Sequence, residues 1–189
     1  MPTTFQKKLA TIAQQQFAKY RFLRENQEPL STQIKSYWED LDFTFPGLST
    51  AWSAVFVSWS VKKAGATAAQ FKFAAAHSRF VFQAIANASA STGMFHGRLP
   101  SQYPPKLGDI LHNNRSGNTF DFAYAKAHKS YESHSAIVME VGVDNRGRYL
   151  RTIGGNESDS VGMKEVRLGA DGRILDQSGL YISIIETLL

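Results

Sequence analysis

The first ninety residues carry apolar side chains at helical spacing. Intervals of three and four residues between apolar positions are typical of helices that bury one face. They predict four helices, over residues 4–24, 29–41, 49–65 and 74–88. The third is apolar on nearly every side, which indicates a helix surrounded by other parts of the protein.

Short polar residues and one glycine predict where these helices begin and end. Ser31 or Thr32 is expected to cap the second helix, and Ser49 or Thr50 the third. Such hydroxyl side chains accept hydrogen bonds from the free N–H groups of a first helical turn. Gly65 is expected to end the third helix, because glycine adopts a left-handed conformation without a steric penalty.

The pattern changes to alternation in the second half, which predicts strands. The change follows a stretch rich in Gly, Pro and Ser at 89–109, and "DNRG" and "GADG" are turn sequences of the hairpin type. The long segment 113–133 is irregular, as expected of a rim over a site or of simple disorder. Helices followed by an antiparallel meander predict the α+β class. The strand candidates are "GDILHN", "HSAIVMEVGV", "RYLRTIGG", "SVGMKEVRL" and "LYISIIETL".

Length and composition favour a single domain over residues 1–189, with a helical half to about 90 and a strand-rich half from about 105. The longest apolar run, at 51–61, is too short for a membrane span. No secretory signal is legible at the N-terminus. We therefore expect a protein that is cytoplasmic as made and that needs a dedicated secretion system if it acts outside.

Charge and residue types exclude several kinds of chemistry. The chain has no cysteine, so disulfides and thiolate chemistry are excluded. The formal charge of +5 is spread along the sequence, which favours a role in solubility over a nucleic-acid stripe. The five histidines lack the spacing of metal motifs, and neither a phosphate loop nor a G-x-S-x-G elbow is present. We expect no metal and no cofactor.

Ser53 is the candidate nucleophile. It falls in the first turn of the buried third helix, where free N–H groups and the helix dipole favour developing negative charge. His134 opens the most apolar strand and is the candidate base, with Asn156 or Glu157 as the group that orients its ring. Each residue also has an ordinary interpretation, Ser53 as a capping or packing serine and His134 as a solvated histidine.

Other polar residues have structural interpretations too. His77 lies on an apolar helix face and is either a satisfied core histidine or part of a pocket lining. Asp109, in "LGDI", is expected to end a turn before a strand. The glycines of "GGN" are expected to supply positive φ angles in a turn.

Several motifs in order resemble a known family. "IKSYWEDL", "AWSAVFVSWSVKKAG", "AAHSRF", "LGDIL", "HSAIVMEVG" and "IGGNESDSV" span roughly residues 34–165. In this order they resemble the uncharacterised bacterial domain-of-unknown-function family 2272. Through that family the chain is similar to the papain-like NlpC and CHAP amidohydrolases, which cleave amide bonds of peptidoglycan peptides.

The resemblance implies a papain-like fold with a nucleophile at the head of a buried helix. Ser53 matches the position where NlpC and CHAP enzymes carry cysteine, His134 matches the catalytic histidine, and Asn156 matches the polar third member. Serine is a departure, because a hydroxyl holds its proton more strongly than a thiol and needs general-base help. A Cys-to-Ser replacement at this position would give the same sequence.

The resemblance also implies a function. Trp52, His77, Asp109 and Glu157 become candidate substrate-binding residues. We expect a peptidoglycan amidase or endopeptidase, acting as an exported antibacterial effector with an immunity or delivery protein as partner, or as a lytic protein. The alternative is a papain-like module that has lost catalysis and binds cell-wall peptides or a protein. An esterase or acyltransferase is the third hypothesis, because esters are easier for serine to attack.

Overall fold

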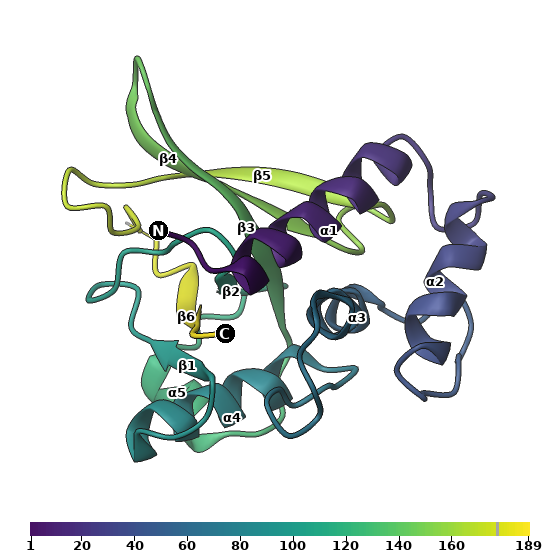
Figure 1. Cartoon of the computed structure of the whole chain (residues 1–189), viewed down its shortest axis with the longest axis horizontal. Coiled ribbons are helices and arrows are strands. Elements are labelled where there is room, and N and C mark those ends of the chain that lie inside the picture. Colours follow the sequence, from purple (N-terminus) through teal and green to yellow (C-terminus); the bar gives the residue numbers. More distant parts are fainter. Residues whose placement is uncertain (177) are drawn as a thin grey trace.

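The computed structural model describes residues 1–176 and 178–189 (Figure 1). Four helices precede a sheet, and a fifth short helix lies between two of its strands. This arrangement confirms the predicted α+β class. The helices are α1 (Thr4–Tyr20), α2 (Leu30–Glu39), α3 (Ser53–Ala64), α4 (His77–Ala90) and α5 (Phe122–Ala127).

Six strands form one antiparallel sheet in the order β1-β6-β2-β3-β4-β5. The strands from β2 to β5 form the predicted meander, and the last strand returns to lie between β1 and β2. The "DNRG" turn joins β3 to β4, as predicted, at the tip of the hairpin that projects from the molecule in Figure 1. The strands are β1 (Phe95–Arg98), β2 (Ile110–Asn114), β3 (Ser133–Asp144), β4 (Gly147–Gly154), β5 (Gly162–Arg167) and β6 (Tyr181–Thr187).

The N-terminal caps of two helices differ from the prediction. Pro29 and Trp52 occupy the N-cap positions of α2 and α3, and neither supplies a side-chain hydrogen bond. The hydroxyl caps predicted at 31–32 and 49–50 are therefore wrong. Helix α3 begins later than expected, after a tryptophan that packs into the core, so its first residue is the serine itself. Gly65 ends α3 with a left-handed φ of 118°, as predicted.

Two elements were not expected. Strand β1 has only four residues and lies inside the Gly- and Pro-rich stretch, so its alternation is too short to recognise. Helix α5 lies inside the segment 113–133, which the sequence predicts as irregular. It has six residues, and the side chain of Asp121 caps it by accepting a hydrogen bond from the Tyr124 N–H.

The two faces of the sheet carry separate apolar clusters. The larger one joins α1 to α4 with sheet residues such as Ile137 and Ile153, and the smaller one, around Val138 and Leu150, lies on the opposite face. Because side chains alternate along a strand, β2, β3, β4 and β6 each contribute to both clusters. In α3 all residues except Lys62 and Lys63 are buried, so this helix is held rigidly.

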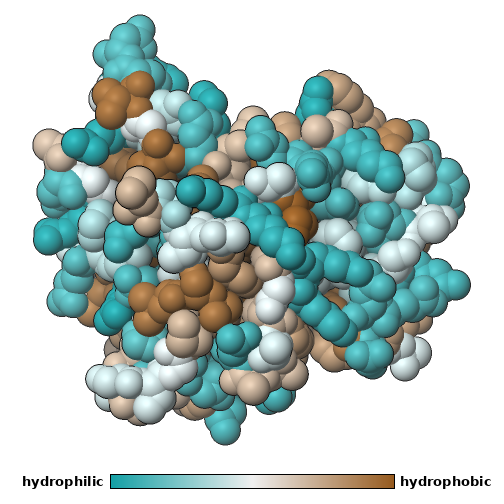
Figure 2. Space-filling view, in the orientation of Figure 1, coloured by the Kyte–Doolittle hydropathy of each residue, from teal (hydrophilic) through white to brown (hydrophobic). Residues whose placement is uncertain are grey.

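The surface in the view of Figure 2 is mainly hydrophilic, with hydrophobic residues in scattered patches. Within the described residues, no helix combines the length and the apolar character that crossing a membrane requires.

Candidate functional site

Ser53 lies at the N-terminus of the central helix and hydrogen-bonds to a histidine. It is the first residue of α3, where the N–H groups of the first turn have no acceptor within the helix. Its Oγ lies 2.8 Å from Nε2 of His77, which is the first residue of α4. Two helix N-termini thus place a hydroxyl and an imidazole in direct contact. Both side chains are buried, with Ser53 only 3% exposed.

The protonation of His77 is controlled by its surroundings. Burial, and next the electrostatic effect of the neighbouring His134, lower the pKa of His77 well below its ordinary value. The ring is therefore neutral at pH 7, and Nε2 can accept the proton of the Ser53 hydroxyl. Its Nδ1 is buried and finds no hydrogen-bond partner within the described residues.

A second pair of polar side chains adjoins this one. His134 lies near the start of β3, and its Nε2 is 2.8 Å from Oε1 of Glu157, an ion-pair distance without hydrogen-bond geometry. Nζ of Lys164 lies 2.6 Å from the other oxygen of Glu157. Burial alone would raise the pKa of Glu157, but the contacts with His134 and Lys164 outweigh it and lower the pKa to about 2. The ring centres of His77 and His134 are 5.3 Å apart.

The four residues, which we call the Ser53 group, form two contacts in a row. Ser53 pairs with His77, and His134 pairs with Glu157, with the two imidazoles side by side. The sequence singled out both histidines but gave the base role to His134, and that role stays a prediction. The contact between Ser53 and His77 leaves no signal in the sequence, because it depends on the tertiary packing that brings two helix N-termini together.

The segment after β4 differs from its predicted turn chemistry. Positive φ belongs to Asn156 (55°), whereas Gly154 and Gly155 are needed for space. A Cβ on Gly154 would lie 3.0 Å from His134 Nε2, and one on Gly155 would lie 2.6 Å from side-chain carbons of Trp52 and Phe56. Gly154 therefore lets the backbone pass close to the imidazole, and Gly155 lets it pass close to the start of α3. Of the two candidates for the third member, Glu157 makes the contact with His134.

Trp52 and Asp109 have structural contacts. Trp52 is fully buried and its indole N–H donates to Glu25 at 2.9 Å, which ties the segment after α1 to the start of α3. The Asp109 carboxylate accepts hydrogen bonds from the Tyr103 hydroxyl and from the backbone N–H groups of Lys106 and Thr187. These partners do not include the Ser53 group, so the substrate-binding roles of both residues stay predictions.

A third buried histidine was not singled out. His112 on β2 lies with Nδ1 2.8 Å from the Ser135 hydroxyl and Nε2 3.1 Å from the Tyr131 hydroxyl. Burial lowers its pKa to about 3. Its ring centre is 6.5 Å from that of His77. Strand alternation could have indicated that this residue faces the core, but not that it approaches the site.

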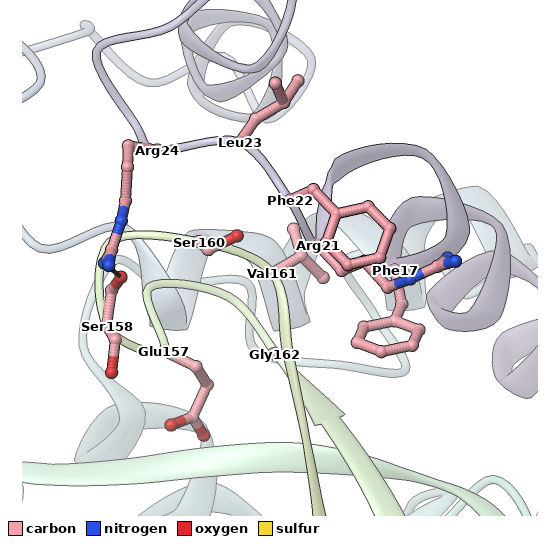
Figure 3. Close-up of a pocket in the computed structure, with 10 residues that line it drawn as sticks. All are labelled: Phe17, Arg21, Phe22, Leu23, Arg24, Glu157, Ser158, Ser160, Val161 and Gly162. Atoms are coloured by element: carbon pink, nitrogen blue, oxygen red, sulfur yellow. Dashed lines mark hydrogen bonds between the residues drawn. The ribbon is translucent and has the colours of Figure 1, made fainter.

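Over residues 1–176 and 178–189, no group of three or more His, Asp or Glu side chains could hold a metal ion. A small cavity of about 50 Å³ has His134, Glu157 and Lys164 in its wall. A larger cavity of about 440 Å³ has Glu157 in one part of its wall and Phe17, near the end of α1, in another (Figure 3).

The comparison with protein families gives one match. The model of a family described as uncharacterised protein conserved in bacteria (DUF2272) matches residues 10–184. The chain belongs to this family. The match includes all four residues of the Ser53 group and extends beyond the region in which the motifs suggested the resemblance. Neither the curated proteins nor the solved structures contain a match to this DUF2272 chain.

Proposed function

We propose that the protein is a serine-dependent hydrolase of amide bonds in peptidoglycan peptides, built on a papain-like fold. The observation that carries the proposal is the 2.8 Å contact between the Ser53 hydroxyl and the His77 imidazole at the N-terminus of a buried helix. A serine becomes a nucleophile when a base within hydrogen-bond distance can take its proton.

The chemistry follows from these two side chains. Oγ of Ser53 bonds to the carbonyl carbon while the hydroxyl proton passes to Nε2 of His77. The protonated ring then gives this proton to the leaving amine as the C–N bond breaks, and water hydrolyses the resulting ester in the same way. The lowered pKa of His77 keeps the ring in the neutral form that the first step requires.

Two features of the surroundings would stabilise charge in this reaction. In the proposal, the free N–H groups at the start of α3, that of Ser53 among them, donate to the carbonyl oxygen as it gains negative charge. The negative charge of Glu157 contacts His134, whose ring centre lies 5.3 Å from that of His77, the ring that must become positive. In the proposal His77 is the base in the resting arrangement, and the pair of His134 and Glu157 supports it.

The substrate class rests on the resemblance of the Ser53 and His134 positions to the catalytic positions of NlpC and CHAP enzymes. In those enzymes a cysteine takes the place of Ser53. The departure makes the neighbouring histidine more important, because a serine hydroxyl is not ionised in advance. A serine at this position is consistent with the observed contact between its hydroxyl and the His77 base.

A second candidate function is a catalytically inactive module that binds cell-wall peptides or a protein. Burial favours it, because Ser53, His77 and His134 are each at most 6% exposed and a substrate needs an opening to reach them. The imidazole Nδ1 of His77, which has no acceptor in the described structure, also departs from a complete triad.

Peptidoglycan digestion by three forms of the full chain tests the proposal. Purified peptidoglycan is incubated with the wild type, Ser53→Ala and Ser60→Ala, and the products are identified by mass spectrometry. Ser60 is a matched control, since it is a buried serine on the same helix without a hydrogen-bond partner among the described residues. We expect new amine and carboxylate ends with the wild type and Ser60→Ala, and a loss of about 10³-fold or more with Ser53→Ala.

Ser53→Cys separates the two candidates. A hydrolase whose geometry suits a nucleophile at this position should cleave peptidoglycan with either side chain. Turnover that requires the cysteine would show that the serine form has lost catalysis. Cell-wall binding by all forms without any cleavage, including Ser53→Cys, would favour the binding module and contradict the hydrolase.

A further inference from the structure

A cavity of about 440 Å³ opens beside Glu157, between the C-terminal end of α1 and the chain that leads into β5. In Figure 3 the rings of Phe17 and Phe22 lie on one side, the Ser158 to Gly162 segment on the other, and Glu157 below. This volume is in the range of pockets that bind small molecules or one residue of a peptide. Its place matters because Glu157 also contacts His134.

The lining combines apolar surface with positive charge. Its hydrophobic residues are Phe17, Phe22, Leu23 and Val161, and its cationic residues are Arg21 and Arg24. The ring of Phe22 is 83% exposed, which is unusual for so large an apolar side chain. A ligand with an apolar group would cover this ring.

The two guanidinium groups are not neutralised by their hydrogen bonds. Arg24 donates to the backbone carbonyl of Ser158, and Arg21 donates to that of Ala18. In the part of the chain that the structure describes, no carboxylate lies at ion-pair distance from either group. The one carboxylate in the lining, that of Glu157, is engaged by His134 and Lys164.

The two arginines differ in what they can offer. The guanidinium of Arg21 lies over the Phe22 ring, 4.4 Å from its centre, and also faces the negative end of the α1 dipole. The side chain of Arg24 extends to the Ser158 segment across one end of the cavity (Figure 3). Arg24 is therefore the main candidate for binding an anion.

The loop opposite the arginines is strained and firmly held. Asn156, Ser158 and Asp159 all adopt left-handed φ angles between 52° and 61°. The Glu25 N–H donates to the Asp159 carbonyl at 2.7 Å, and the Ser160 hydroxyl donates to the Tyr20 carbonyl at 3.1 Å. Strain of this kind persists where the surrounding structure enforces it, and it gathers at functional sites. The loop thus fixes Glu157 relative to the arginines.

We propose that this cavity is a substrate subsite that binds a carboxylate next to an apolar side chain. The inference rests on the proposed function, because it takes the Ser53 group as the reacting centre. Arg24 binds the carboxylate, and Phe17 and Phe22 cover the apolar group. Glu157 forms the wall shared by the subsite and the His134 contact, so the bound part of the substrate lies next to the pair of Glu157 and His134.

Two small probes test the subsite without any need for catalysis. N-acetyl-leucine has the apolar group and the carboxylate, whereas N-acetyl-leucinamide lacks only the charge. Each is titrated into the ¹⁵N-labelled full chain, followed by the amide signals of Val161 and Gly162. We expect the acid to bind about fivefold or more tightly than the amide, as one partly solvated charge-assisted hydrogen bond would give.

Variants locate the binding. Arg24→Gln should lower the affinity for N-acetyl-leucine to that for the amide, and Arg21→Gln should lower it less. The control Arg148→Gln, at an exposed position of β4, should leave it unchanged. Arg21→Gln keeps the test decisive if loss of the Arg24 bond to Ser158 unfolds the loop. Equal affinities for the two probes, or affinities that neither arginine variant alters, would overturn the subsite.

The result can be separated from that of the proposed function. Ser53→Ala should bind N-acetyl-leucine like the wild type, so a protein that binds the acid but never cleaves peptidoglycan disproves the hydrolase and leaves the binding site. In an active protein, Arg24→Gln should raise KM for peptidoglycan fragments about fivefold with kcat nearly constant. Cleavage with unchanged KM in Arg24→Gln would reject the substrate role.

Discussion

Two buried polar groups, around Asp109 and around Ser53, differ in how completely their hydrogen bonds are satisfied. Asp109 is fully buried, and its carboxylate accepts three hydrogen bonds, one from a tyrosine hydroxyl and two from the backbone. Next to Ser53, by contrast, His77 leaves one ring nitrogen without a partner in the described residues, and His134 meets Glu157 without hydrogen-bond geometry.

The difference separates a structural role from a chemical one. A buried polar group that lacks a partner costs free energy, and a role in chemistry is one reason for a protein to retain it. A fully satisfied group such as Asp109 instead joins the segments that bond to it, here the end of β6 and the loop at 103–106, to the start of β2. We expect substitutions around Ser53 to change activity and those around Asp109 to change stability.

The largest expected effect belongs to His77→Gln. Loss of the base that contacts Ser53 should lower kcat for peptidoglycan cleavage about 10³-fold, within the range of general-base catalysis. The unfolding free energy should change by only about 1 kcal/mol, since the glutamine fills much of the same space. Activity and urea denaturation of the same preparations measure both quantities.

His134→Gln and His96→Gln are the comparison variants. His96 lies on β1, hydrogen-bonds to the Thr92 carbonyl and takes no part in the site, so its variant should keep full activity. A loss in His134→Gln larger than that in His77→Gln would restore the base role predicted from the sequence. It would also mean that the resting contact of Ser53 is not the reactive one.

The sequence predicted the architecture better than the contacts within the site. Periodicity revealed α1 to α4 and five strands, because each is long enough to show which face is buried. Ser53 was recognisable because a buried helix begins beside it. Its contact with His77 was not, since the two residues are brought together only when α3 and α4 pack with their N-termini close. The glycines at 154–155 were misread because a need for space leaves no local signature.

Asp109→Asn should have a smaller effect, on stability. An amide has one acceptor oxygen, so at least one of the donors from Tyr103, Lys106 and Thr187 would lose its partner. The expected loss of unfolding free energy is about 1–3 kcal/mol. Peptidoglycan cleavage per folded molecule should stay that of the wild type. A folded variant with lost activity would show that the two polar groups are not separate.

The pH dependence of the same variant gives a second measurement. Burial raises the pKa of Asp109 to about 7, from an ordinary value of 3.8. The native state therefore binds more protons than the unfolded state between these values, and this carboxyl makes the protein less stable as pH rises through them. Urea denaturation from pH 4 to pH 8 should show that decline in the wild type and less of it in Asp109→Asn.

The smallest expected effect is that of Glu157→Gln. This variant tests whether the Ser53 group also contributes to the stability of the fold. Contacts with His134 and Lys164 hold the pKa of Glu157 near 2, below its ordinary value of 4.5. Its contribution to stability is thus complete above pH 4.5 and disappears as pH falls toward 2. The variant should lack this acid-dependent loss and cleave about tenfold more slowly, because a tenfold change corresponds to only about 1.4 kcal/mol in the barrier. Unchanged activity in the variant would show that Glu157 has only a structural role, as expected of Asp109.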